Sequence, residues 1–140
     1  MDIGMFGPAL ALGLSAIGSA VGCGIAGMAS HAVMSRVEEG HGKYIALSAM
    51  PSSQVIYGFV LMLLMRNAMD AGTLSQASAL GIGIGSGTAI LFSAIFQGKV
   101  CATGIQASAK QPAIYGKCIA SIGIIESFAL FAFVFAILLM

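Results

Sequence analysis

Four long stretches of this chain are almost free of charged residues. Residues 3–35, 44–65 and 71–98 contain none, and residues 118–140 contain one. A helix that crosses a bilayer needs about 20 apolar residues, because each residue adds a rise of about 1.5 Å. Each stretch is long enough for one crossing, so the sequence predicts an all-α membrane protein with four transmembrane helices. We expect these helices at about residues 4–34, 44–66, 72–108 and 113–140.

The composition excludes the main soluble classes of protein. Hydrophobic residues make up 59% of the chain and charged residues 8%, whereas a soluble domain carries about 25% charged residues. The formal net charge of +1 provides no basic patch for nucleic acid, and we find no nucleotide-binding motif. We therefore expect a non-catalytic protein in contact with membrane lipid. The first apolar stretch is too long for a cleaved signal peptide, so we expect it to remain as a span.

The two halves of the chain repeat each other without a gap at an offset of 74 residues. Residues 42–46, GKYIA, align with residues 116–120, GKCIA. Chance similarity between apolar segments is the alternative, but this match falls in the same register as the others. Because each half crosses the membrane twice, the two copies have the same orientation. The expected units are two tandem duplicated hairpins, residues 1–70 and 71–140.

Basic residues are distributed unevenly between the two ends of these hairpins. The connection between the hairpins contains one basic residue, Arg66, whereas the tips contain four: Arg36, Lys43, Lys110 and Lys117. Cytoplasmic loops carry an excess of Lys and Arg. We therefore expect a multi-pass protein of the cell membrane, with both hairpin loops in the cytoplasm and both termini on the outer side.

Glycines concentrate in the first helix of each hairpin. They are Gly13, Gly18, Gly22, Gly24 and Gly27 in the first helix, and Gly81, Gly83, Gly85 and Gly87 in the third. Small residues let helix backbones approach closely in a bilayer, whereas the second and fourth helices are rich in Phe, Leu and Met and suit lipid. Small helices inside and bulky helices outside predict a homo-oligomeric ring, which two hairpins cannot close alone.

Glu126 is the single carboxylate deep inside a predicted span. A charge at the bilayer centre costs about 2.5–3.5 kcal/mol on insertion scales, so an acid there indicates a functional site. A buried carboxyl avoids this cost by binding a proton or a cation. The alternative, a tolerated polar core residue, leaves the cost unexplained.

Polar side chains from two other predicted helices lie at the depth of Glu126. At the usual helical rise, Glu126 is about 18 Å from the cytoplasmic end of its helix. Ser53 and Gln54 in the second helix, and Gln97 in the third, are each about 16 Å from that end. We therefore expect these four side chains to meet near the middle of the membrane.

One face of the second helix carries several oxygen atoms. The spacing i, i+3, i+4 and i+7 of a single helical face is found in Met50, Ser53, Gln54 and Tyr57. Pro51 is expected to bend the helix and to loosen backbone carbonyls in that turn.

These groups predict a binding site for a monovalent cation. Hard cations prefer oxygen ligands, and one carboxylate among several neutral oxygens suits Na⁺. The candidate metal ligands are Glu126, Gln54, Ser53 and Gln97. Two alternatives stay open: the carboxyl carries H⁺ instead, or the two glutamines only join helices by hydrogen bonds.

A duplicated hairpin with an acid in its fourth helix resembles the membrane-rotor proteolipid, subunit K or c, of V-type and A-type rotary ATPases. Three segments resemble the bacterial sodium-translocating members: residues 51–59, PSSQVIYGF; residues 97–99, QGK; and residues 125–127, IES. The resemblance implies a rotor-ring subunit that carries Na⁺ on Glu126, coupled to ATP hydrolysis in other subunits.

The resemblance also implies ligands and partners. The ion ligands would be the Met50 backbone carbonyl, Ser53, Gln54, Gln97 and Glu126, with Tyr57 as a hydrogen-bonding lid on the carboxylate. Ser53 departs from the family pattern, in which Thr is usual. Ser52 occupies the position of Glu126 in the repeat, which implies one ion per four helices and a pump rather than a synthase. The expected partners are identical protomers, a stator membrane subunit with a basic residue, and a central-stalk subunit at the cytoplasmic loops 35–43 and 109–117.

Other functions fit the residues less well. A proton-driven rotor shares every feature except the amides and hydroxyl around the acid. A small multidrug antiporter also has four helices and one membrane glutamate, but it carries the acid in its first helix and is not duplicated. An ion channel would need polar residues at several levels. No covalent cofactor is expected. The three cysteines have no metal-binding spacing, and we interpret them as packing residues: Cys23, Cys101 and Cys118.

Overall fold

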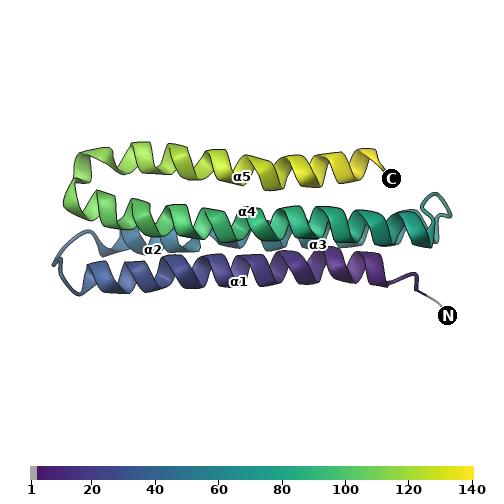
Figure 1. Ribbon diagram of the computed structural model, residues 1–140, viewed down its shortest axis with the longest axis horizontal. Coiled ribbons are helices and arrows are strands. Elements are labelled where there is room, and N and C mark those ends of the chain that lie inside the picture. Colours follow the sequence, from purple (N-terminus) through teal and green to yellow (C-terminus); the bar gives the residue numbers. More distant parts are fainter. Residues whose placement is uncertain (1–2) are drawn as a thin grey trace.

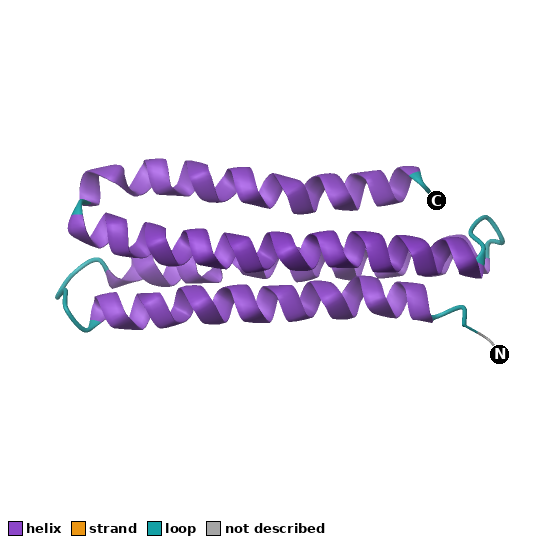
Figure 2. Cartoon of the chain, viewed as in Figure 1, coloured by secondary structure: helices purple, strands orange, loops and turns teal. Residues whose placement is uncertain are grey.

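The computed structural model describes residues 3–140, which form four long helical rods packed side by side (Figure 1). Each rod is long and apolar enough to cross a membrane, and every regular element of this region is helical (Figure 2). The predicted all-α fold with four spans is confirmed. The elements in chain order are α1 (Phe6–Met34), α2 (His41–Ala49), the 3-10 turn η1 (Met50–Ser52), α3 (Ser53–Asp70), α4 (Gln76–Lys110), the 3-10 turn η2 (Pro112–Ile114) and α5 (Tyr115–Leu138).

The second rod is longer than predicted at both ends. It consists of α2, η1 and α3, and it begins at His41, directly after Gly40, which turns the chain with a φ of 79°. It continues past the predicted end at residue 66. There the exposed side chains of Arg66 and Asp70 lie 3.9 Å apart in an i, i+4 pair, which supports a helix in water.

The third rod begins four residues later than predicted, at Gln76 instead of residue 72. Gly72 turns the preceding loop with a φ of 75°. The hydroxyl of Ser75 then accepts a hydrogen bond from the Ser78 N–H and so caps the new helix. The local turn chemistry, rather than the last charged residue, sets this boundary.

Both hairpin tips lie at one end of the molecule (Figure 1). The beginning of α1, the C-terminus and the connection between the hairpins lie at the opposite end. The basic residues of the two tips are therefore gathered on one side of the spans. That this side is cytoplasmic stays a prediction.

The two glycine-rich helices, α1 and α4, lie against each other, and α3 and α5 flank them. A Cβ at Gly98 would overlap the backbone of Gly22, and a Cβ at Gly83 would overlap the backbone of Gly7. The absence of side chains at these contacts lets the two backbones touch. The flanking helices α3 and α5 then pack against this α1–α4 pair.

Large apolar side chains on the flanking helices α3 and α5 point outward. Four phenylalanines are between 47% and 60% exposed: Phe59, Phe128, Phe131 and Phe135. An apolar surface of this extent is unusual for a soluble monomer and suits the hydrocarbon of a bilayer or contact with another chain.

Candidate ion-binding site

A proline interrupts the second rod beside the predicted site. Pro51 has no N–H to donate, and one 3-10 turn over Met50–Ser52 replaces the α-helix there. The proline ring is buried against Gly22 of α1, where a Cβ would come within 2.8 Å of it. The helix resumes at Ser53, whose N–H donates to the Met50 carbonyl. The expected interruption is present, but this carbonyl keeps one backbone partner.

Glu126 of α5 accepts hydrogen bonds from two neighbouring helices. From α3, the Ser53 hydroxyl donates to Oε1 at 2.6 Å and the Tyr57 hydroxyl donates to the same oxygen at 3.3 Å. From α4, the Gln97 amide donates to Oε2 at 3.3 Å. Both carboxylate oxygens are therefore held, and the half-buried acid is oriented by two neighbouring helices at once.

The two glutamines join the same three helices behind the carboxylate. Both side chains are fully buried. The Gln54 amide of α3 donates to Gln97 Oε1 at 2.6 Å, and the Gln97 amide also donates to the Ile122 carbonyl of α5 at 3.4 Å. These bonds satisfy the polar groups, as the hydrogen-bonding alternative requires, but they also position oxygen atoms beside the acid.

Three acceptor oxygens converge on the hydroxyl of Ser53. Its Oγ lies 2.6 Å from Glu126 Oε1, 3.2 Å from the Met50 carbonyl and 3.2 Å from Gln54 Oε1. A serine hydroxyl has one proton to donate, so it cannot satisfy all three acceptors at once. Lone pairs of these oxygens are therefore left for another donor or for a cation.

All six residues predicted from the sequence lie in this one cluster, Met50 through its carbonyl. Ser53, Gln54 and Tyr57 come from one face of α3, as the helical spacing indicates. The cysteines provide none of these contacts and are free thiols.

Two further serines support the site and were missed by the sequence analysis. The Ser19 hydroxyl of α1 accepts from the Val55 N–H at 2.9 Å, in the first turn of α3 after the proline. The Ser93 hydroxyl of α4 donates to the Ile125 carbonyl at 2.9 Å, next to Glu126. Ser19 and Ser93 are separated by the repeat offset of 74. The repeat itself was therefore the signal that could have found them.

Lys99 lies within α4 close to the site but does not pair with the acid. Its ammonium group lies 4.9 Å from the centre of the Phe96 ring, a geometry typical of a cation–π contact. Within residues 3–140, Glu126 forms no ion pair. The carboxylate therefore depends on hydrogen bonds, and its charge is left for a proton, a cation or a residue of another subunit.

The chain matches a known family twice. The sequence profile of the family of the ATP synthase C subunit matches residues 6–65 and again residues 80–139. This chain belongs to that family. Each match covers one hairpin, which agrees with the two tandem duplicated hairpins expected from the repeat.

Two relatives narrow the type of rotary ATPase. The V-type sodium ATPase subunit K of Enterococcus hirae is 35% identical over 127 residues, which cover 89% of this chain and 81% of the relative. The A-type ATP synthase subunit K of Methanocaldococcus jannaschii is 32% identical over 138 residues, which cover 99% of this chain and 61% of that relative. The chain is thus a membrane-rotor proteolipid of the V/A type, a non-catalytic kind of subunit, and this family forms oligomeric rings.

Proposed function

We propose that this proteolipid carries Na⁺ on Glu126 past a stator subunit, driven by ATP hydrolysis in other subunits. The observation that supports Na⁺ is the excess of acceptor oxygens around the Ser53 hydroxyl. A proton on the carboxyl needs one acceptor nearby, whereas this site presents a carboxylate oxygen, an amide oxygen, a hydroxyl and a backbone carbonyl together. Such a set of hard oxygen ligands with one negative charge matches a monovalent cation.

The site residues have separate roles in this proposal. Glu126 supplies the charge, and Ser53, Gln54 and the Met50 carbonyl supply neutral oxygen ligands. Gln97 holds Oε2 by its amide and contributes its own oxygen, while Tyr57 donates to Oε1 from the outer side. Because these bonds already hold the carboxylate in the chain, little reorganisation is needed when the ion binds.

Neutralisation of the carboxylate is what allows movement through lipid. An exposed charge at mid-membrane costs about 2.5–3.5 kcal/mol on insertion scales, so the empty site resists leaving the stator. A basic residue of the stator, an arginine by family resemblance, pairs with Glu126 and releases the Na⁺. When the acid leaves that residue, a new Na⁺ from the other side neutralises it again.

We further propose that the first hairpin, residues 1–70, carries no ion and that residues 71–140 contribute the carrier. The cytoplasmic tips, residues 35–43 and 109–117, would then contact the central stalk. Lys43 of the first tip already lies over the ring of Tyr115 at the second, 5.7 Å from its centre. The two tips thus form one joint surface at this end of the molecule, and both termini would lie outside the cell membrane.

Transport of H⁺ by the same carboxyl is the second candidate. The hydrogen bond between the two glutamines supports it, because this bond joins α3 to α4 without a metal ion. In that case the Ser53 and Tyr57 hydroxyls, which both donate to Oε1, would stabilise Oε1 as the unprotonated oxygen. The two candidates differ in what competes for Glu126.

Carbodiimide modification distinguishes these candidates, because the reagent reacts with a protonated carboxyl. Purified rings are labelled over a range of pH with and without Na⁺, and Glu126→Gln serves as the blank. Under the Na⁺ proposal, Na⁺ slows labelling of Glu126, and K⁺ at equal ionic strength protects less. Labelling that ignores Na⁺ at every pH would reject the sodium proposal and leave the proton-driven rotor.

A further inference from the structure

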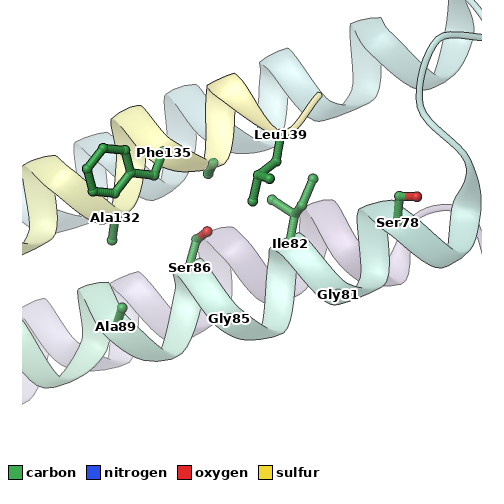
Figure 3. A pocket seen from close by; sticks show the side chains of 10 residues that line it. Ser78, Gly81, Ile82, Gly85, Ser86, Ala89, Ala132, Phe135 and Leu139 are labelled. Carbon is green, nitrogen blue, oxygen red and sulfur yellow. The ribbon is translucent and has the colours of Figure 1, made fainter.

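A small cavity lies between the two hairpin tips. Its volume is about 220 Å³, and both hairpins line it, with Glu39, Gly40, Lys43 and Tyr44 from the first and with Ser108 and Tyr115 from the second. The wider groove between α4 and α5, of about 550 Å³, is lined by small and apolar residues and two serines, without a charged side chain (Figure 3). The cavity at the tips is smaller but combines charge with hydroxyl groups, so its chemistry is that of a polar ligand site.

The cavity borders the beginning of α2. The first turn of an α-helix leaves backbone N–H groups without acceptors inside the helix. Gly40, which lines the cavity, is the N-cap of α2 and provides no side-chain hydrogen bond to them. The start of a helix also carries partial positive charge. This end of α2 therefore favours an anion, provided that other groups of the cavity favour one too.

Lys43 adds a full positive charge in the same turn of α2. Its ammonium group lies 5.7 Å from the centre of the Tyr115 ring, which belongs to the second hairpin. Within residues 3–140, Lys43 forms no ion pair. The cavity thus contains a cation between the two tips whose charge this chain does not neutralise.

A nearly buried hydroxyl is an independent indication of a ligand. Tyr44 is 6% exposed, and its hydroxyl oxygen would lie 4.0 Å from a Cβ at Gly40, on the same cavity. No group in residues 3–140 forms a hydrogen bond with this hydroxyl, whereas the buried Ser108 hydroxyl donates to the Ile105 carbonyl at 3.1 Å. A nearly buried donor without a partner is unfavourable, and an anionic oxygen in the cavity would accept from it.

We propose that this cavity binds a phosphate group through the first N–H groups of α2, the Lys43 ammonium and the Tyr44 hydroxyl. A phosphate group has several acceptor oxygens and negative charge, which these donors match. The tips lie at one end of the spans (Figure 1), at the level of the lipid headgroups, so a phospholipid is one source of this group. Free phosphate is the other source. The site joins the two tips and is independent of the ion that Glu126 carries.

Glu39 gives the proposal a sign that can be tested. Its carboxylate lines the same cavity, and it would repel an anion but attract a cation. Glu39→Gln should therefore tighten phosphate binding, whereas Lys43→Gln should weaken it. A cation site would show both changes with the opposite sign.

Thermal dissociation of the purified ring measures this binding. Delipidated rings in a neutral detergent are titrated, at constant ionic strength, with inorganic phosphate, with phosphatidylglycerol or with diacylglycerol, which has no phosphate. We expect a phosphate-containing ligand to raise the dissociation temperature and diacylglycerol to leave it unchanged. Lys43→Gln should raise the half-saturating concentration about tenfold or more, and Tyr44→Phe should raise it by about 2–10-fold. Because the Tyr44 hydroxyl has no partner in the chain, Tyr44→Phe should assemble normally.

Lys117→Gln is the matched control for Lys43→Gln. Lys117 follows a glycine at the start of α5, at the repeat position of Lys43, but Cys118 stands there in place of Tyr44. Lys117→Gln should leave the half-saturating concentration unchanged.

The three ligands also identify the source of the phosphate group. A response to phosphatidylglycerol alone assigns the site to a lipid headgroup, and a response to inorganic phosphate as well means that the phosphate group alone suffices. Four results would overturn the proposal: no response to either ligand, equal effects of Lys43→Gln and Lys117→Gln, no effect of Tyr44→Phe, or weaker binding in Glu39→Gln.

Discussion

The seam between the two hairpins contains a polar cluster, whereas its repeat equivalent is almost apolar. Glu126 of the cluster corresponds to Ser52, Gln97 corresponds to Cys23, and Gln54 corresponds to Phe128. In a ring of these chains, Ser52, Cys23 and Phe128 would meet at the seam between two neighbouring copies. That seam then lacks the carboxylate and both amides.

The backbone contacts do not share this difference. Gly98 touches α1 inside the chain, and its equivalent Gly24 is left open for the same contact. Ser19 and Ser93 each bond the backbone of a flanking helix. Packing and ion binding are therefore separable in this protein. The two hairpins share the packing residues, whereas one seam alone carries the carboxylate and both amides.

The largest effect is expected at the one position where the two seams differ in charge. Glu126→Gln should reduce Na⁺ uptake by the reconstituted ATPase to the level of protein-free vesicles, because the amide can neither neutralise the ion nor pair with the stator. Ser52→Ala, at the equivalent position, should retain transport, since the exposed Ser52 hydroxyl bonds the Ala49 carbonyl within its own helix. Loss of transport in both variants would show that the two seams are functionally alike.

Substitutions of glycines on the two faces should block different stages, folding of the chain or assembly of the ring. Gly22→Leu or Gly83→Leu should prevent the chain from folding, because each side chain would overlap the backbone of the other central helix. Gly24→Leu should leave the protomer folded but unable to form a ring. Size-exclusion chromatography in mild detergent separates these outcomes: aggregated or degraded chain for the first two variants, and a folded protomer for the third. A ring formed by all three variants would show that neither set of glycines is needed for close helix packing.

Removal of either glutamine amide should lower the affinity for Na⁺ strongly but not abolish binding. Gln97 donates to the carboxylate, and a hydrogen bond to a charged group contributes about 1.5–3 kcal/mol, so Gln97→Ala should weaken Na⁺ protection of Glu126 by about 10–100-fold. Gln54→Ala removes a proposed oxygen ligand and the donor to Gln97, so it should weaken protection in the same direction. The acid itself should stay reactive towards carbodiimide in both variants. Cys23→Ala, at the equivalent of Gln97, is the matched control and should leave the Na⁺ concentration for half-protection unchanged.

The smallest effect is expected from removal of the Tyr57 hydroxyl, the lid on the carboxylate. Tyr57 donates to Glu126 over 3.3 Å and its ring stacks on Phe133 at 5.8 Å between centres. Tyr57→Phe keeps the stacking and removes one long hydrogen bond to the carboxylate, so Na⁺ protection should weaken by about 2–10-fold. Phe131→Tyr adds a hydroxyl at the equivalent position and should not strengthen it. A change of the same size from Phe131→Tyr would mean that the second seam also reaches the ion.

Local patterns explain why much of this was predictable from the sequence. The spans follow from the spacing of charged residues, and the polar face of α3 follows from the 3.6-residue period that brings Ser53, Gln54 and Tyr57 together. The helix ends were off by several residues, because Gly40, Gly72 and the Ser75 cap act through turn geometry that a hydropathy pattern does not contain.

The sequence alone determined the four spans, the duplication and the depth shared by the acid and its polar neighbours, because each follows from the spacing of residues along the chain. The tertiary structure decided which glycines are used within the chain and which are left open. It also decided that three acceptors meet at one serine hydroxyl, and that Ser19 and Ser93 hold the neighbouring backbone. These features depend on the rotation of each helix about its own axis. That rotation is set by the close contact of α1 with α4, where residues about 74 positions apart touch.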